Sequence, residues 1–275
     1  MKVILVPVAD RPECAKALNT AFDLGKRVGA SVSGCHIRPH RDSKVSLASA
    51  FADAEWRKKS NKKSSSAAKT LYRNAAEHNG YDMIRRPRQE PGALYREAVG
   101  SPDVLMGIVG PSSDLVVVSR PTKGGGVAEI FMNAAVMEST VPTLIVPQRG
   151  ARNIGKRIMI GWNQSPEASR TLRASIALLV AAQEVTLVTC GPEDHPGPKA
   201  SEMKRYLAHW GVKAEMLATR GRHIEQELMD AYKELGADML VAGSYSRSRW
   251  REKVFGGTTD YLLHKASVPV LTMHS

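Results

Sequence analysis

Short apolar runs alternate along this chain with longer segments whose apolar residues recur at helical spacing. In the second half, RIMIGW precedes a segment from about Pro166 to Ala182 with Leu172 and Leu179 on one face. This spacing predicts a strand followed by a helix. The alternation continues with strands EVTLVTC, KAEMLAT, DMLVAGS and VPVLTM and with helices KASEMKRYLAHWG, IEQELMDAYKELG and GTTDYLLHKA. Gly211 and Gly236 stand where two of these helices would end.

The first half of the chain follows the same alternation with one long interruption. Five apolar runs predict strands near residues 2–8, 31–37, 82–86, 114–119 and 143–147. A helical stretch of roughly residues 45–79 separates the second strand from the third. Nearly continuous apolar strands that alternate with helices are typical of a parallel, doubly wound α/β sheet. In that architecture a ligand binds beyond the carboxyl ends of the strands, where the strand order reverses.

Three pairs of matching segments show that the chain contains two copies of one unit. KVILVPVADRPECAKAL at 2–18 matches KRIMIGWNQSPEASRTL at 156–172, DLVVVSRP at 114–121 matches DMLVAGSY at 238–245, and VPTLIVP at 141–147 matches VPVLTMH at 268–274. The matches keep the same order, and the last two follow each other at nearly the same spacing in both copies. We therefore expect two tandem five-stranded domains, residues 1–149 and 150–275, with a polar linker around 147–156.

The first copy is longer than the second between its first two matches, which begin at positions 2 and 114 in the first copy and at 156 and 238 in the second. The difference indicates an insertion of about 30 residues, and the Lys/Ser-rich segment at about 42–75 is the candidate. Its basic part, residues 56–69, contributes to the net charge of +12. We interpret this basic arm as a solvated helix face or a flexible arm, with nucleic-acid contact as the alternative, and we do not expect nucleic acid as the main partner.

Composition places the chain among globular proteins, with 43% hydrophobic and 24% charged residues. No apolar run reaches the roughly 18 residues that a membrane span needs, so we expect no membrane partner. MKVILVPVADRPE favours a buried strand over a signal peptide, because acidic residues follow it and no small-residue cleavage site does. The three cysteines lack CxxC spacing, which favours reduced thiols, a cytoplasmic location and no zinc site.

The segment GSYSRSRWREKVFGGTT, residues 243–259, has features of a phosphate-binding loop. Gly243 ends an apolar strand, where the missing Cβ lets a ligand approach the backbone. Gly256 and Gly257 precede the last helix, whose first N–H groups are unpaired and attract phosphate, and Thr258 adds a hydroxyl. The same spacing equally fits an ordinary strand–loop–helix connection in which the glycines serve turn geometry only.

These segments together resemble the universal stress protein family, and within it the bacterial tandem type with two such domains in one chain. The residues that carry the resemblance are ILVPV, IGWNQSPEASRTL and GSYSRSRWREKVFGGTTDYLLHKASVPVLTM, and it covers nearly the whole chain apart from the basic arm. The resemblance implies two adenine nucleotide alpha hydrolase-like domains packed as a pseudo-two-fold intramolecular dimer. The last strands, VPTLIV and VPVLTM, would pair and so cover edges that otherwise invite aggregation.

The resemblance also assigns residues to a nucleotide site. ATP-binding members of the family carry Gly, two residues, Gly, nine residues, Gly and then Ser or Thr. On this chain Gly243 and Gly256 match the first and third glycines. Ser246 replaces the second glycine and Gly257 replaces the hydroxyl residue, with Thr258 directly after it. The backbone N–H groups of the two glycines before the helix are still available to phosphate.

The two copies differ in how well they keep this pattern. The family's acidic residue that contacts the ribose corresponds to Asn163, whose amide can still hydrogen-bond a hydroxyl. The first copy has Ala9 at that position and Ser119 in place of the leading glycine. Its loop is too short for the pattern, although Lys123 and the glycines at 124–126 look superficially like a phosphate loop. We expect one nucleotide site, in the second domain, and a structural first domain.

The resemblance implies a stress-response binding or signalling module whose second domain binds ATP or another adenine nucleotide, with Mg²⁺ accompanying it. We expect little or no catalysis, at most slow ATP hydrolysis, because the chain shows no Walker lysine, metal-binding carboxylate pair or positioned base. A homodimer and an unidentified protein partner are compatible with this role. Two alternatives stay open: a nucleotide-free structural or interaction protein of the same fold, and a nucleic-acid-associated protein that uses the basic arm.

Overall fold

The computed structural model describes residues 1–38, 62–122, 126–244 and 257–274. The chain forms two compact units, Met1–Arg152 and Asn153–Ser275. No helix within the described residues is long and apolar enough to cross a membrane.

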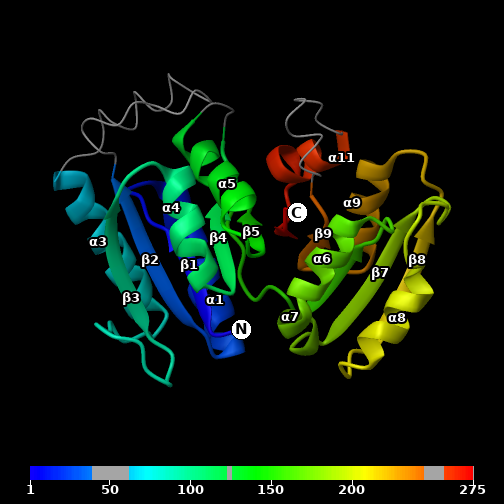
Figure 1. The fold of residues 1–275 in the computed structure, drawn as a ribbon, viewed down its shortest axis with the longest axis horizontal. Helices are drawn as coiled ribbons and strands as arrows, with labels where there is room; N and C mark the ends of the chain where they lie inside the picture. The colour runs from blue at the N-terminus through cyan, green and yellow to red at the C-terminus, as the bar shows by residue number, and fades with distance from the viewer. Residues whose placement is uncertain (39–61, 123–125, 245–256, 275) are drawn as a thin grey trace. The chain divides into compact units, whose positions relative to one another are not determined.

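The first unit is a parallel sheet with helices on both faces. Its elements are β1 Val3–Pro7, α1 Pro12–Val28, β2 Ser31–Arg38, α3 Lys62–His78, β3 Ala93–Val99, α4 Pro102–Val109, a 3₁₀ turn Gly110–Ser112, β4 Leu115–Ser119, α5 Val127–Glu138 and β5 Thr143–Val146. The strand order is β3-β2-β1-β4-β5, and each pairing is parallel. Figure 1 shows α4 and α5 on one face of this sheet and α1 and α3 on the other.

The second unit has the same architecture. Its elements are β6 Arg157–Gly161, α6 Pro166–Ala174, α7 Ile176–Val180, β7 Glu184–Cys190, α8 Ala200–Ala208, β8 Ala214–Thr219, α9 Ile224–Glu234, β9 Met239–Ala242, α11 Gly257–Asp260, a π-helical turn Tyr261–Lys265 and β10 Val270–Thr272. The strand order is β8-β7-β6-β9-β10, again parallel throughout. Leu228 and Tyr232 of α9 and Leu262 of the π-helical turn share one buried cluster with the strand residues Met159 and Leu240.

These two sheets confirm the predicted α/β class with mainly parallel five-stranded sheets. Strands β5 and β9 are buried along their whole length, as a parallel sheet covered on both faces requires. Gly211 and Gly236 end α8 and α9 as predicted: both have positive φ, and the next residue's N–H reaches back to a carbonyl five positions earlier. The pairing of the last strands across a pseudo-two-fold axis stays a prediction.

The predicted strand at 82–86 is wrong. The third strand of the first unit is β3, Ala93–Val99, and Met83 makes only an isolated bridge to Ala93. Pro87 and Pro91 explain the displacement, because proline has no N–H to donate to a ladder and the chain must leave the sheet before the strand can form.

The helix predicted from Pro166 to Ala182 is broken in two at Ser175. The Ser175 hydroxyl is buried and donates to the Thr171 carbonyl at 2.6 Å, and its N–H is shared between the Thr171 and Leu172 carbonyls. Such a bond back to the preceding turn competes with the regular helix pattern. Helical spacing of apolar residues continues across the break, so the pattern alone does not reveal it.

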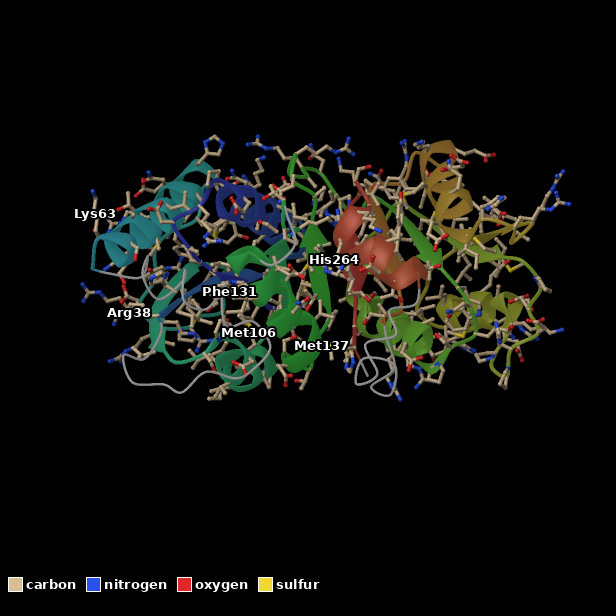
Figure 2. All side chains as sticks on the ribbon, turned by 90° about the horizontal axis from the view of Figure 1, so that it is seen from above. Arg38, Lys63, Met106, Phe131, Met137 and His264 are labelled. Atoms are coloured by element: carbon tan, nitrogen blue, oxygen red, sulfur yellow. The ribbon has the colours of Figure 1, made fainter. Side chains whose placement is uncertain are left out.

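The connection between the second and third strands differs most between the units. It runs over positions 39–92 in the first unit and over 191–213 in the second, so it is more than twice as long in the first. Residues 62–69 of the basic arm belong to α3, and residues 56–61 lie outside the described residues. Tyr72 of α3 is fully buried, and a Cβ on Gly34 of β2 would lie 2.5 Å from its ring. Figure 2 shows Arg38, which ends β2, and Lys63 of α3 toward the same outer edge of this unit.

An aspartate at the start of the fourth strand anchors each sheet. In the second unit, Asp238 accepts hydrogen bonds from the N–H groups of Gly155, Lys156 and Arg157, at 2.5, 3.0 and 3.0 Å. Its own N–H donates to the Arg157 carbonyl at 2.9 Å. Three charge-assisted bonds to successive N–H groups hold the start of β6 against the start of β9.

The first unit repeats this device at the equivalent position. Asp114 accepts from the N–H groups of Lys2 and Val3 at 2.5 and 2.9 Å, and its N–H donates to the Val3 carbonyl. The aspartate that opens the matching segments DLVVVSRP and DMLVAGSY is therefore a structural residue. It sits at the amino ends of the strands, opposite the edge where a ligand would bind.

Replacing Asp238 by alanine should lower the free energy of unfolding by about 2–4 kcal/mol, because three N–H groups lose a charged acceptor. Urea denaturation followed by far-UV circular dichroism would measure the change. Asp194→Ala is the matched control, since Asp194 is exposed and removes the same charge. Equal shifts in the two variants would contradict the anchoring role.

Candidate functional site

The candidate site of the second unit lies at the carboxyl ends of β6 and β9. The chain leaves β6 toward β7 on one side, and β9 pairs with β6 on the other, so strand order reverses between these two strands. Asn163 follows β6 and Gly243 follows β9. The structure thus places both predicted residues at the switch point, where open α/β sheets bind their ligands.

Asn163 is exposed and forms the turn that starts α6. Its Oδ1 accepts from the Ser165 N–H at 3.2 Å and from the Ser165 hydroxyl at 2.7 Å, which is an Asx-turn. Ser165 in turn caps α6 by accepting from the Ala168 N–H at 3.1 Å. The side-chain oxygen of Asn163 is therefore occupied by hydrogen bonds within this turn. The side-chain NH₂ group is left to donate to a ligand.

Gly243 packs directly against the first turn of α6. A Cβ at this position would lie 2.5 Å from the Ala168 nitrogen and 2.8 Å from the Glu167 carbonyl carbon. Backbone atoms cannot move aside as a flexible side chain would, so glycine is required here by helix–strand packing. The glycine that opens the loop therefore has a structural reason independent of any ligand.

Thr258 and Gly257 lie beside a carboxylate of α9. The Thr258 hydroxyl donates to Glu225 Oε1 at 2.8 Å, and a Cβ on Gly257 would lie 3.3 Å from the same oxygen. No sequence signal marks Glu225, because it lies far from Thr258 along the chain and meets it only through packing of the two helices. Its negative charge would oppose a phosphate placed at the start of α11.

The other two predicted residues, Ser246 and Gly256, lie outside the described residues, as do Lys123 and the glycines at 124–125. One further polar group stands at the switch point. Ser244 is 5% exposed, and its Oγ has no hydrogen-bond partner in the part of the chain that the structure describes. A buried hydroxyl without a partner is costly, so this group is suited to a bond with a ligand or a water.

A second loop closes over the end of β6. The Trp162 indole N–H donates to the Pro198 carbonyl at 3.0 Å, and the Gln164 side chain donates to the Gly197 carbonyl at 3.0 Å. Gln164 also accepts from the His195 N–H at 3.1 Å, so His195 serves here through its backbone. These bonds fix the loop after β7 beside the residues that precede α6.

The loop after β8 is organised by Glu227. Hydrogen bonds from the Thr219 hydroxyl and from the N–H groups of Gly221, His223 and Arg222 hold the pKa of Glu227 at about 2. The Glu227 oxygens lie 2.7 to 3.1 Å from those three nitrogens. Gly221 is required because a Cβ there would lie 2.5 Å from the Gly191 Cα.

The corresponding place in the first unit is nearly closed. Ser119 occupies the position of Gly243, and its hydroxyl donates to the Glu13 carbonyl at 2.5 Å. The cavity there, lined by Cys14 and by Phe131, which Figure 2 labels, has a volume of about 40 Å³. Ligand pockets are roughly 300 Å³ or larger, so the space suits water and not a nucleotide. Burial raises the pKa of Cys14 to about 11, which keeps its thiol protonated and unreactive.

Within the described ranges, no group of three or more His, Cys, Asp or Glu side chains is placed to hold a metal ion. The geometry thus defines a doubly wound α/β protein with a candidate ligand site at one strand switch point.

Residues 155–274 match the model of the universal stress protein family. A universal stress protein of Mycobacterium tuberculosis (strain ATCC 25618 / H37Rv) is 36% identical over 73 residues, which cover 26% of this chain and 25% of that protein. One of Synechocystis sp. (strain ATCC 27184 / PCC 6803 / Kazusa) is 28% identical over 141 residues, covering 48% of this chain and 46% of that protein. The chain therefore matches less than half the length of these curated relatives.

The crystal structure of a universal stress protein from Archaeoglobus fulgidus DSM 4304 has a TM-score of 0.72 to this chain at 13% identity. The similarity covers 99% of this chain and 96% of that one, and it shows that the fold is shared over both units. Residues 155–274, which make up most of the second unit, match the universal stress protein family, and the chain as a whole shares its fold with a universal stress protein of known structure.

Gly243→Ala should lower the free energy of unfolding by about 1–3 kcal/mol, because the added methyl group meets the backbone of α6. Gly161→Ala is the control, since a Cβ there would have only ordinary contacts of 3.6 Å or more. Urea titration of both variants would test the difference. Equal free energies of unfolding for Gly243→Ala and Gly161→Ala would contradict the close packing of Gly243 against the backbone of α6.

Glu227 should contribute to stability in a pH-dependent way. Its folded pKa of about 2 lies below the ordinary value of 4.5, so its contribution is present above about pH 5 and is lost as the pH falls from 4.5 toward 2. The melting temperature of Glu227→Gln should therefore lie below that of the wild type at pH 7 and converge with it near pH 2. Glu234→Gln, at the exposed end of α9, should show no such convergence.

Proposed function

We propose that this protein is a tandem stress-response binding module whose second domain binds an adenine nucleotide, ATP or a related one, beyond the ends of β6 and β9. The Ser244 hydroxyl at the switch point, which is buried and has no hydrogen-bond partner among the described residues, is the observation that carries the proposal. A ligand hydroxyl or amine at this place would satisfy it. The exposed Asn163 amide lies after the neighbouring strand and supplies a second donor.

The proposed roles follow from the chemistry of each group. Asn163 would donate to a ribose hydroxyl, and Gly243 would leave room beside the backbone for the ligand. The N–H groups that begin α11 at Gly257 and Thr258 would face phosphate oxygens, together with Ser246 and Gly256. Mg²⁺, if it accompanies the nucleotide, would neutralise phosphate charge, and Glu225 is the nearest described carboxylate to Thr258. We propose binding without catalysis, or hydrolysis that is slow at most.

Specific contacts also favour a second function, a nucleotide-free interaction protein of the same fold. Gly243 is required by packing against α6, Asn163 is engaged in a turn, and the Thr258 hydroxyl is bound to Glu225. Each of these residues therefore has a structural role that needs no ligand. The two functions differ in one measurable property, the response of stability to nucleotide.

Thermal denaturation with ATP, ADP and AMP, with and without Mg²⁺, tests the proposal. At a concentration about tenfold above the dissociation constant, a ligand stabilises the folded state by about 1.4 kcal/mol, which raises the melting temperature by a few degrees. In the titration without Mg²⁺, Glu225→Gln should increase ATP affinity by about three- to tenfold, because it removes a negative charge next to the phosphates. The gain should be smaller for AMP, which carries fewer phosphate charges.

Glu234→Gln is the matched control, since it removes the same charge from the exposed far end of the same helix. It should leave the affinity for every nucleotide unchanged. Absence of any shift at millimolar nucleotide, in the wild type and in Glu225→Gln alike, would reject the nucleotide proposal and favour the interaction protein.

A further inference from the structure

The first unit contains a second cavity, of about 430 Å³, away from its switch point. Its floor is one face of three neighbouring strands. Leu5 of β1, Ser33 of β2 and Leu94 of β3 are direct neighbours in register and all line the cavity. The volume is within the range of about 300–1,000 Å³ that is typical of small-molecule sites.

The walls of this cavity are strongly basic. Arg85 and Arg88 come from the connection before β3, Arg96 comes from β3 itself, and Lys2 comes from the start of β1. Among the described residues that line the cavity, none is Asp or Glu. The cavity therefore gathers four cationic side chains around a partly apolar floor.

Nearby carboxylates offset only part of this charge. Asp82 pairs with Arg88 at 3.4 Å. Asp114 accepts from the backbone N–H groups of Lys2 and Val3, as its anchoring role requires. Arg85 and Arg96 make no ion pair with a carboxylate in the described part of the chain, and Arg96 hydrogen-bonds the neutral Cys35 thiol, so the charge of both guanidinium groups is left for an anion. A guanidinium group presents paired donors that match the oxygens of a phosphate.

The second unit provides an internal comparison, because its strands keep the same register. In the first unit Ser31 of β2 pairs with Val3 of β1. At the equivalent place in the second unit, Glu184 of β7 pairs with Arg157 of β6. By the same pairing, the position of Leu94 corresponds to Glu215. Glu184 pairs with Arg157 at 3.3 Å, and Glu215 pairs with Lys204 at 3.5 Å. The positive cavity is therefore a property of the first unit and not of the shared fold.

We propose that this cavity of the first unit binds a small phosphorylated molecule with an apolar part. Arg85 and Arg96 would hold the phosphate, the Ser33 hydroxyl would add a donor, and Leu5 and Leu94 would contact the apolar part. The residues lie toward the amino ends of the strands, so this site is distinct from a site at the carboxyl ends and is independent of the proposed nucleotide site. The first unit then has a binding role of its own.

Isothermal titration calorimetry of the full chain with phenyl phosphate tests the proposal, with inorganic phosphate as the probe that lacks an apolar part. Phenyl phosphate should bind more tightly than inorganic phosphate, and its binding should weaken as salt is raised. The double variant Arg85→Gln, Arg96→Gln should weaken binding of phenyl phosphate by at least about tenfold. The double variant Arg73→Gln, Arg152→Gln removes the same charge from exposed positions outside the cavity and should leave binding unchanged.

A second variant tests the floor of the cavity. Leu94→Glu copies the residue of the second unit at a half-buried position of the cavity floor and should abolish binding, while circular dichroism checks that the fold is kept. Glu225→Gln should leave phenyl phosphate binding unchanged, and any ATP-induced stabilisation should persist in the Arg85, Arg96 double variant.

Absence of heat at millimolar phenyl phosphate would overturn the proposal. Equal weakening in the two double variants would also overturn it, because the anion would then respond to general surface charge. A response to Glu225→Gln but not to the cavity arginines would place the anion in the second unit and overturn it as well.

Discussion

The aspartate at the start of the fourth strand is the contact on which each unit depends. Asp114 and Asp238 accept hydrogen bonds from successive N–H groups at the start of the first strand, so the two central strands begin at one level. Parallel pairing then carries this register to the other end of both strands. The Asp238 carboxylate at the amino ends of the strands therefore also fixes where β6 and β9 end relative to each other. The candidate site lies at those carboxyl ends.

At the carboxyl ends of the strands, the two units share their backbone arrangement but differ in the space left beside the fourth strand. In the second unit, the first turn of α6 approaches β9 so closely that only Gly243 fits, and the buried Ser244 hydroxyl has no partner in the described part of the chain. In the first unit, Ser119 is accommodated and bonds to Glu13, and the space that remains is about 40 Å³. A single difference between glycine and serine therefore accompanies a change in how helix and strand pack. The fold is shared by both units, and the potential for function resides in their sites.

The two units also diverge on the face of the sheet near the amino ends of the strands. Ser31 and Leu94 of the first unit correspond in register to Glu184 and Glu215 of the second. In the second unit the carboxylates are paired with basic residues, whereas in the first unit the basic residues border an open cavity. A duplicated fold can thus keep its hydrogen-bonded frame while the charges on one face change from neutralised pairs to a cationic pocket. Such a difference leaves the backbone unaffected, because side chains take no part in the backbone hydrogen bonds that pair the strands.

The sequence by itself determined the repeat, the α/β class and most elements, because apolar periodicity and glycine caps such as Gly211 and Gly236 act over a few residues. It also placed Asn163 and Gly243 near one another, since both follow strands that meet at a switch point. Local pattern failed at β3, where two prolines delay the strand, and at Ser175, where a hydroxyl bond interrupts a helix with unbroken apolar spacing. Only the tertiary structure decided that Glu225 lies against Thr258, that Gly243 is needed for packing, and that Arg85 and Arg96 border one cavity. These contacts join segments far apart in the chain, and their distances depend on how whole helices and strands pack.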